Sequence, residues 1–248
     1  MMKVSIVTVV LNCELYITDC IQSVLQQQKA NIEYIIIDGG SLDGTLAIIS
    51  QYVEGISIFI SEKDDGYYSA LNKGIRMATG DIIGVLNADD VLADPYVISS
   101  IIDCFERASC DAIYGNLVYT ARNDIQKVKR NWQSESFLPS SIQYGWMPPH
   151  PTLYLRKEIF HSYGLYARNF GLSADYEMVV RLFYRKKIKS LFLNRLIVRM
   201  RSGGVSNRGV KQLFSAIIDD YKVLVFNRVP LPILALAGKK LRKLKQFI

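Results

Sequence analysis

The sequence has few of the residues that mark disulfide-rich, zinc-binding or disordered proteins. Its 248 residues include 4 cysteines, 7 prolines and 2 histidines. The spacing of the cysteines matches neither a Cys-x-x-Cys zinc site nor a dense disulfide framework, so we expect reduced thiols. With 50% apolar and 21% charged residues, the chain is neither disordered nor collagen-like. It is long enough to bury a full core.

The sequence also lacks a stretch that predicts a membrane span or a secretory leader. The longest uncharged stretch, 136–155, contains four prolines, Gln143 and His150, which do not fit a spanning helix of about 20 apolar residues. The first residues, MMKVSIVTVV, lead into a β-branched run without a small-residue cleavage site and predict a first strand. We therefore expect a cytoplasmic protein.

Acidic residues are missing from the end of the chain. Residues 221–248 hold seven lysines and arginines and no acid, which accounts for the whole formal net charge of +7. This pattern predicts a basic amphipathic helix that contacts an anionic membrane surface, with a solvated terminal helix as the alternative. We expect no nucleic-acid partner, because Phe247 is the only aromatic side chain among the basic residues of 234–248 that could stack on a nucleobase. The apolar stripe of residues 234–248 consists of Leu234, Ala237, Leu241, Leu244 and Ile248.

Strand-like and helix-like stretches alternate along the first half of the chain. Such alternation predicts an α/β fold, Rossmann-like, with a mostly parallel central sheet flanked by helices. The predicted strands of this half are 4–10, 32–37, 56–60 and 82–86, and the helices are 16–28, 43–53 and 67–77. Further on, the pattern predicts strands at 112–120, 125–132 and 190–200, a proline-rich loop at 139–151, and helices at 174–186 and 212–226.

Three successive predicted strands end in acidic loops. The first loop is the glycine-rich segment 38–45, the second holds Glu62, Asp64 and Asp65, and the third is 87–90. The carboxyl ends of parallel strands meet at one edge of a sheet, where ligands commonly bind. We therefore expect these carboxylates to share one ligand-binding edge.

The glycine-rich loop 38–45 does not match a dinucleotide-binding turn. Its glycines lie at 39, 40 and 44, which does not fit G-x-G-x-x-G. The glycines can let a ligand approach the backbone while Asp38 accepts N–H groups of a nucleobase. Alternatively, Asp43 caps a helix and the glycines only form the turn.

The segment Asn87-Ala88-Asp89-Asp90 is the strongest local signal. Adjacent carboxylates at a strand end repel each other unless a cation lies near them. Mg²⁺ or Mn²⁺ binds such oxygens and completes its shell with phosphate oxygens, as in a nucleotide diphosphate. In the alternative interpretation, Asp90 caps the next helix and Asp89 is a solvated turn residue.

Asp175 lies in the first turn of the predicted helix 174–186. The helix dipole keeps a carboxylate there ionised, so that it can act as a base once substrate excludes water. Helix capping is the alternative. His150 lies between two prolines and can line a pocket or be a loop residue, whereas His161 is predicted on a helix surface.

Short motifs follow one another in a specific order. They are SIVTVVLN at 5–12, DGGSLDGT at 38–45, Asp65-Gly66, Asn72-Lys73-Gly74, ATGD at 78–81, NADD at 87–90, ADY at 174–176 and GGVS at 203–206. Together they resemble the family 2 glycosyltransferases of GT-A fold, over roughly residues 3–207. Within this family the chain is similar to bacterial enzymes that build surface polysaccharides and glycolipids, such as lipopolysaccharide O-antigen.

The resemblance implies a division of labour along the chain. Residues 1–115 would form the nucleotide-sugar-binding half, 116–210 the acceptor-binding half, and 211–248 a C-terminal helix and a basic membrane-proximal tail. Asp175 would be the catalytic base, and Asp89, supported by Asp90, would bind Mg²⁺ or Mn²⁺. The acceptor side would include Trp146, His150 and Ser206. The donor, expected to be a UDP-sugar, would bind at Thr8, Asn12, Asp38, Gly39, Asp65, Asn87 and Ala88.

The activity that the resemblance implies is an inverting, metal-dependent transfer. A sugar would pass from a nucleotide diphosphate sugar to a hydroxyl of a lipid-linked oligosaccharide, at the inner face of the plasma membrane. Two positions depart from the family pattern, since Asn87 replaces the first Asp of its D-x-D motif and Val9 replaces a proline. The alternative is a catalytically inactive nucleotide-binding or membrane-surface interaction protein on the same scaffold.

Overall fold

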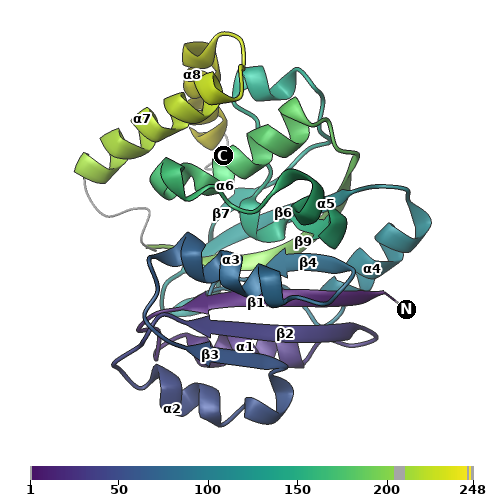
Figure 1. Cartoon of the computed structure of the whole chain (residues 1–248), viewed down its shortest axis with the longest axis vertical. Coiled ribbons are helices and arrows are strands. Elements are labelled where there is room, and N and C mark those ends of the chain that lie inside the picture. The colour runs from purple at the N-terminus through teal and green to yellow at the C-terminus, as the bar shows by residue number, and fades with distance from the viewer. Residues whose placement is uncertain (1, 204–209, 245, 247–248) are drawn as a thin grey trace.

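The computed structural model of the chain describes residues 2–203, 210–244 and 246, with the backbone alone for 210–214. The described residues form a nine-stranded mixed sheet (Figure 1). Its strands are β1 (Lys3–Val10), β2 (Asn31–Asp38), β3 (Ile58–Ser61), β4 (Ile82–Val85), β5 (Val91–Leu92), β6 (Ala112–Ala121), β7 (Asp124–Trp132), β8 (Tyr154–Arg156) and β9 (Ser190–Arg201).

The strand order is β3-β2-β1-β4-β8-β6-β9-β5, with β7 paired to β6. The first four strands run parallel, and β8 is antiparallel to both β4 and β6. The predicted α/β architecture, a mostly parallel sheet flanked by helices, is confirmed. One continuous sheet therefore joins the two predicted halves of the chain.

Helices cover both faces of the sheet (Figure 1). They are α1 (Ile17–Leu25), α2 (Thr45–Ser50), α3 (Tyr67–Met77), α4 (Val97–Arg107), α5 (Lys157–Tyr163), α6 (Ala174–Val179), α7 (Val210–Phe226) and α8 (Pro232–Leu244). Short 3-10 turns are η1 (Val53–Gly55), η2 (Ser141–Tyr144), η3 (His150–Thr152) and η4 (Arg168–Ser173), and η5 (Val180–Arg185) is a π-helical turn.

Three predicted helices are shorter than expected. The helix predicted at 16–28 is observed as Ile17–Leu25. The helix predicted at 43–53 begins at Thr45, because Asp43 Oδ1 accepts the backbone N–H of Thr45 at 3.0 Å and so closes the turn before it. The N-cap of α2 is Gly44, without a side-chain cap bond, so the interpretation of Asp43 as the helix cap is wrong. The helix predicted at 174–186 is α-helical only to Val179 and continues as the π-turn η5.

The parallel strands are buried on both faces, which explains their continuous apolar sequences. Val7, Ile35 and Ile37 lie in one core cluster with residues of α3 and α6, and Ile6 and Ile36 lie in the other with residues of α1 and α4. The period of two along each strand thus divides its side chains between two cores.

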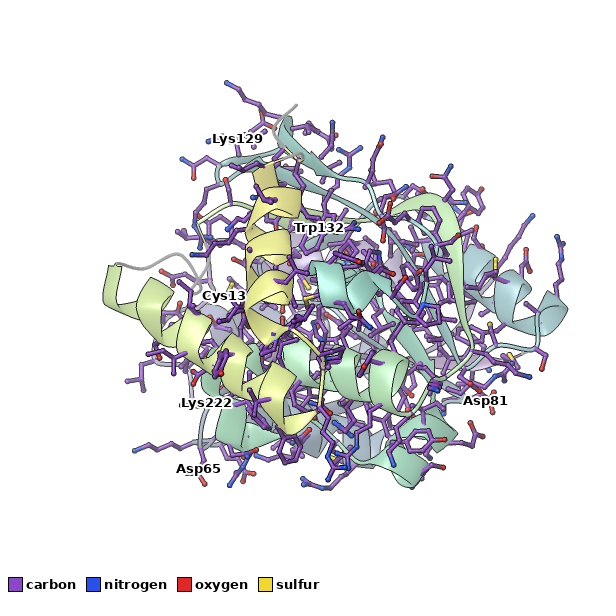
Figure 2. All side chains as sticks on the ribbon, turned by 90° about the horizontal axis from the view of Figure 1, so that it is seen from above. Cys13, Asp65, Asp81, Lys129, Trp132 and Lys222 are labelled. Carbon is purple, nitrogen blue, oxygen red and sulfur yellow. The ribbon has the colours of Figure 1, made fainter. Side chains whose placement is uncertain are left out.

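The C-terminal helices form an outer layer over the second half (Figures 1 and 2). α8 packs closely on η2 at Gly238. A Cβ added at this position would lie only 2.3 Å from the carbonyl oxygen of Tyr144. Ala235 on the same face is fully buried. Among the helices in the described part of the chain, none is long and apolar enough to cross a bilayer.

Candidate active site

Asp38 organises the first loop from within. The carboxylate is fully buried and accepts the backbone N–H groups of Gly40 and Ser41 at 3.0 Å and the hydroxyls of Ser41 and Ser61. These bonds use both oxygens inside the loop. Asp38 therefore fixes the backbone of 39–41 from behind, and the partly exposed Gly39 lies nearer the solvent.

The other predicted donor residues divide between the interior and the surface. Thr8 is fully buried, with its hydroxyl 3.3 Å from that of Tyr34. Asn12 is exposed at φ +50°, and its Oδ1 accepts the N–H of Leu42 at 2.8 Å, which joins the ends of β1 and β2. The side chain of Asp65 is 90% exposed, with one oxygen 4.0 Å from Arg168.

The two acids of the Asn87–Asp90 segment point in different directions. Asp90 is fully buried and accepts the Asn87 amide at 2.8 Å and the backbone N–H of Arg201 at 3.0 Å. Burial and the charge of Asp89 raise the pKa of Asp90 to about 8. It caps no helix, since α4 begins at Val97 after Tyr96. Asp89 is 24% exposed and is therefore the carboxylate with an accessible oxygen.

The donor set that fits a hard divalent cation is centred on Asp89. In the part of the chain that the structure describes, no three His, Cys, Asp or Glu side chains are grouped to hold a metal ion. Mg²⁺ and Mn²⁺ commonly use one or two carboxylates and take their remaining ligands from water and phosphate. The single accessible carboxylate of Asp89 fits this type of site, whereas both oxygens of the predicted second ligand, Asp90, are already bonded within the protein.

Asp175 lies at the start of α6 among aromatic side chains. Its Oδ1 accepts the backbone N–H of Tyr176 at 2.6 Å. Desolvation and then the charge of Asp175 raise the pKa of Tyr68, whose ring stacks on Tyr166 at 5.7 Å. His150 Nε2 is 2.7 Å from the Tyr166 hydroxyl. Burial lowers the pKa of His150, and the negative charge of Asp175 opposes that shift.

Tyr67 connects the two acidic regions. Its hydroxyl donates to Asn87 Oδ1 at 2.9 Å, and its ring lies edge-on to Tyr68 at 5.1 Å. Desolvation raises the pKa of Tyr67, and so do the charges of Asp175, Asp90 and Asp89, in that order. Asp175 and Asp89 therefore act on the same hydroxyl. Both carboxylates therefore lie near Tyr67.

The predicted acceptor-side residue Trp146 lies in the core. Trp146 is 2% exposed and packs against Tyr114, Phe137 and Phe183, with ring centres 5.0–5.7 Å away. The proline-rich segment folds back onto the domain, so this ring fills the core and does not line an open pocket. Ser206 lies outside the described residues.

Sequence reasoning missed three residues at this edge. Tyr67 directly follows the acidic loop 62–66, which was a local signal for it. Arg122 and Arg201 contact Asp89 through its side chain at 3.2 Å and its backbone oxygen at 2.7 Å. Both are distant in the sequence, and no local pattern distinguishes them from the other arginines of the chain.

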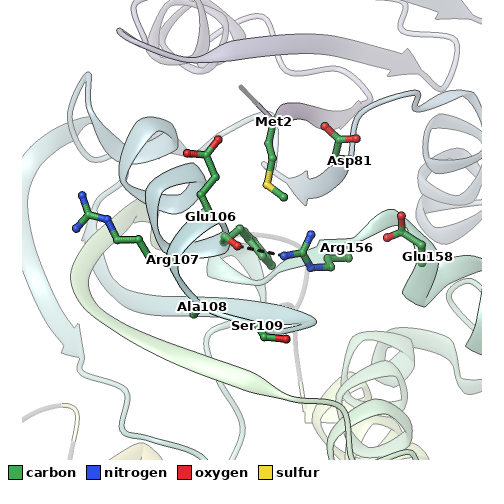
Figure 3. Close-up of a pocket in the computed structure, with 9 residues that line it drawn as sticks. Met2, Asp81, Glu106, Arg107, Ala108, Ser109, Arg156 and Glu158 are labelled. Carbon is green, nitrogen blue, oxygen red and sulfur yellow. Dashed lines mark hydrogen bonds between the residues drawn. The ribbon is translucent and has the colours of Figure 1, made fainter.

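An open hollow of about 880 Å³ lies at the opposite edge of the sheet (Figure 3). It is lined by Met2 and Asp81, which precede β1 and β4, and by Arg156 at the end of β8. Arg156 donates to the backbone oxygen of Phe105 at 3.1 Å. This hollow is separate from the acidic edge, where the parallel strands end.

The chain is similar in sequence and in fold to known glycosyltransferases. A PGL/p-HBAD biosynthesis glycosyltransferase of Mycobacterium bovis (strain BCG / Pasteur 1173P2) is 25% identical over 215 residues, which cover 85% of this chain and 81% of that protein. S. aureus TarS 1-349 in complex with UDP-GlcNAc has a similar fold, with a TM-score of 0.71 and 18% identity over 99% of this chain and 71% of that one. The longer TarS chain is covered to 43%.

A third similar protein was solved with a donor and a metal. The mannosyltransferase PcManGT from Pyrobaculum calidifontis, in complex with GDP-Man and Mn²⁺, has a TM-score of 0.64 and 15% identity over 98% of this chain and 70% of that one. The fold of the chain is that of the GT-A glycosyltransferases. The family model of glycosyl transferase family 2 matches residues 5–174, more than half of the sequence. The chain therefore belongs to glycosyltransferase family 2.

Proposed function

We propose that the protein is an inverting transferase that moves a sugar from a UDP-sugar to a hydroxyl of a lipid-linked glycan in cell-surface polysaccharide biosynthesis. The observation that carries this proposal is a pair of adjoining tyrosines between the two acidic regions. The Tyr67 hydroxyl donates to Asn87 Oδ1 at 2.9 Å, and the Tyr68 hydroxyl donates to the backbone oxygen of Leu172, three residues before Asp175, at 3.4 Å. A base and a phosphate-binding carboxylate on the same side of the sheet are what a displacement at a sugar carbon needs. The family match and the UDP-GlcNAc complex of TarS support the donor class.

We assign donor binding to the first half, residues 1–115. Asn12, Gly39 and Asp65 line its accessible rim, and Thr8 and Asp38 support the loop from the interior. Asn87 and Ala88 precede the accessible carboxylate of Asp89. Mg²⁺ or Mn²⁺ at Asp89, when bound, neutralises charge on the departing diphosphate. The Mn²⁺ complex of PcManGT supports a divalent ion in this fold.

In the proposed reaction, Asp175 takes the proton of an acceptor hydroxyl. The acceptor oxygen forms a bond to the anomeric carbon as the bond from that carbon to the diphosphate oxygen breaks, and the configuration inverts. The acceptor half, residues 116–210, contributes His150, which the Tyr166 hydroxyl orients beside Asp175.

The test is Asp175→Asn in the full chain, with UDP affinity and transfer from a panel of UDP-sugars to lipid-linked acceptors as readouts. We expect UDP affinity to stay unchanged and transfer to fall about a hundredfold or more. Asp103→Asn on the exposed surface of α4 is the matched control and should keep full activity. Unchanged turnover in Asp175→Asn would remove Asp175 from the mechanism. UDP binding by the native protein without any transfer would favour the inactive nucleotide-binding alternative.

We further propose that α8 binds an anionic membrane surface, which would hold the enzyme at the inner face of the plasma membrane. The apolar stripe predicted from the sequence faces outward, because Leu234, Leu241 and Leu244 are 44%, 63% and 62% exposed. The small residues Ala235 and Gly238 occupy the packed face instead. Ile248, the last residue of the predicted stripe, lies outside the described residues.

Basic side chains accompany this exposed stripe. Lys240 and Lys243 on α8 are exposed, and so are Lys127 and Lys129 on the edge strand β7. Burial and the charges of Arg130 and Lys239 lower the pKa of Lys243, which indicates that β7 and the end of α8 lie close together. The view from above agrees, with Lys129 beside that end of α8 (Figure 2). Apolar and cationic side chains on one surface are typical of interfacial helices.

A further inference from the structure

Arg122 pairs with Asp89 from the turn between β6 and β7. Its Nη1 is 3.2 Å from Asp89 Oδ2, and the two side chains are 38% and 24% exposed. The guanidinium carbon also lies 4.5 Å from the ring centre of Tyr16. The Asp89 carboxylate thus already has a positively charged partner, Arg122, within the chain itself.

Arg201 lies over the same Tyr16 ring, at 4.9 Å, but is held differently. Its side chain is 4% exposed, and it donates to Asp19 Oδ2 at 2.5 Å and to the backbone oxygen of Asp89 at 2.7 Å. Arg201 therefore fixes the backbone of the segment. Arg122, more than a third of which faces solvent, is the arginine with room to change partners.

A guanidinium and a divalent cation compete for one carboxylate, because two positive groups beside the same oxygens repel each other. A nucleotide diphosphate removes this conflict, since its several negative oxygens give both positive groups a partner. Arginine suits phosphate especially well, because its planar fork donates two parallel hydrogen bonds. Binding of the cation and of the nucleotide would then favour each other.

We propose that Arg122 acts as a removable counter-ion, which occupies Asp89 in the empty site and moves to the diphosphate when the nucleotide arrives. This inference rests on the proposed function. Arg122 is a positioning residue in this scheme. Its effect is to make cation binding at Asp89 depend on the nucleotide, so that metal and donor enter together.

The experiment is a Mn²⁺ titration of the full chain, followed by the electron paramagnetic resonance signal of free Mn²⁺, with and without UDP. An ion pair that is partly exposed contributes about 1 kcal/mol, so removing it should change the Mn²⁺ affinity of Asp89 about fivefold. We therefore expect Arg122→Gln to bind Mn²⁺ about fivefold more tightly than the native chain in the absence of UDP. The factor by which UDP tightens Mn²⁺ binding should shrink accordingly. Arg122→Lys keeps the charge, so its Mn²⁺ affinity without UDP should stay close to that of the native protein.

The matched control is Arg242→Gln. The side chain of Arg242 is also 38% exposed and pairs with an acid, Glu135, outside the acidic edge, so its loss should leave both Mn²⁺ affinities unchanged. If Arg122→Gln leaves Mn²⁺ affinity without UDP unchanged while the native chain binds Mn²⁺ with UDP, the inference is wrong and the proposed function stands. If the native chain binds neither UDP nor Mn²⁺, both are wrong.

Discussion

Glu33 ties together the starts of the parallel strands. It lies almost buried on β2, where it accepts the Ser5 hydroxyl at 2.6 Å and the Thr79 backbone N–H at 2.7 Å and pairs with Lys3 at 2.9 Å. Burial alone would raise its pKa, but the bonds from Ser5, Thr79 and Lys3 prevail and lower it to about 2. An ionised carboxylate is thus part of the folded state.

The pKa of Glu33 gives a pH-dependent prediction. Because the folded state lowers this pKa, its contribution is present above the unfolded pKa of about 4.3 and is lost as the pH falls toward 2. Glu33→Gln should lower the free energy of unfolding by about 2 kcal/mol at pH 7 and flatten its decrease between pH 5 and 2. Urea unfolding at a series of pH values measures both. A variant that loses stability with falling pH as steeply as the native protein would contradict this role.

Tyr67 gives a prediction for the site itself. Tyr67→Phe removes the bond to Asn87 and so loosens the Asn87–Asp90 contact, and we expect about fivefold weaker UDP binding with unchanged melting temperature. Calorimetric UDP titration measures this. Tyr52→Phe is the control, since it loses a similar bond to Gln22 at 3.0 Å outside the acidic edge. Equal UDP affinity in the two variants would argue against a positioning role for Tyr67.

Residue-level prediction succeeded where a local pattern carried the information. The strand-end position of Asp89 and the helix-start position of Asp175 follow from periodicity, and the structure brings the two to one edge. Arg122, by contrast, reaches Asp89 only through the pairing of β6 with β9 and β7. The direction in which Asp90 points depends on Arg201, which lies 111 residues further along the chain. Such partners are fixed by tertiary structure.

At the scale of elements, most strands with a clear apolar pattern were predicted, and the two shortest strands were missed. β1, β2, β6 and β9 match their predicted ranges to within a few residues. β5 and β8, with 2 and 3 residues, are too short to show a period, and they exist because neighbouring strands offer them partners. The amphipathic helix α4 was also missed.

The backbone contact between α8 and η2 gives an element-scale prediction. Gly238→Ala raises the intrinsic helix propensity of α8, but its Cβ would lie 2.3 Å from the Tyr144 oxygen and 2.6 Å from the carbonyl carbon. We expect α8 to shift from η2 at a cost of about 1–3 kcal/mol, seen as faster amide hydrogen exchange in α8. Ala237→Ser on the exposed face should leave exchange unchanged. Equal protection in both variants would show that the close approach is not needed for docking.

At the scale of the whole molecule, residues 221–248 account for the whole formal net charge of +7, and its effect on membrane binding can be tested on α8. Each lysine near an anionic leaflet contributes about 1 kcal/mol, so Lys240→Gln with Lys243→Gln should weaken binding to phosphatidylglycerol vesicles about thirtyfold. Cosedimentation measures this, and binding of the native chain should weaken as salt increases. Replacing the exposed Glu106 and Glu158 by Gln is the control. Equal binding to neutral phosphatidylcholine vesicles would contradict an electrostatic contribution.

The continuous sheet that links the proposed donor and acceptor halves limits how the protein can open. Backbone hydrogen bonds join β4 to β8, β8 to β6 and β6 to β9. The two halves therefore cannot rotate apart as rigid domains without breaking these hydrogen bonds. Admission of the donor and escape of the product must then depend on side chains and loops at the rim. We therefore expect the turnover rate to be more sensitive to substitutions in these side chains and loops than to substitutions in the segments that connect the two halves.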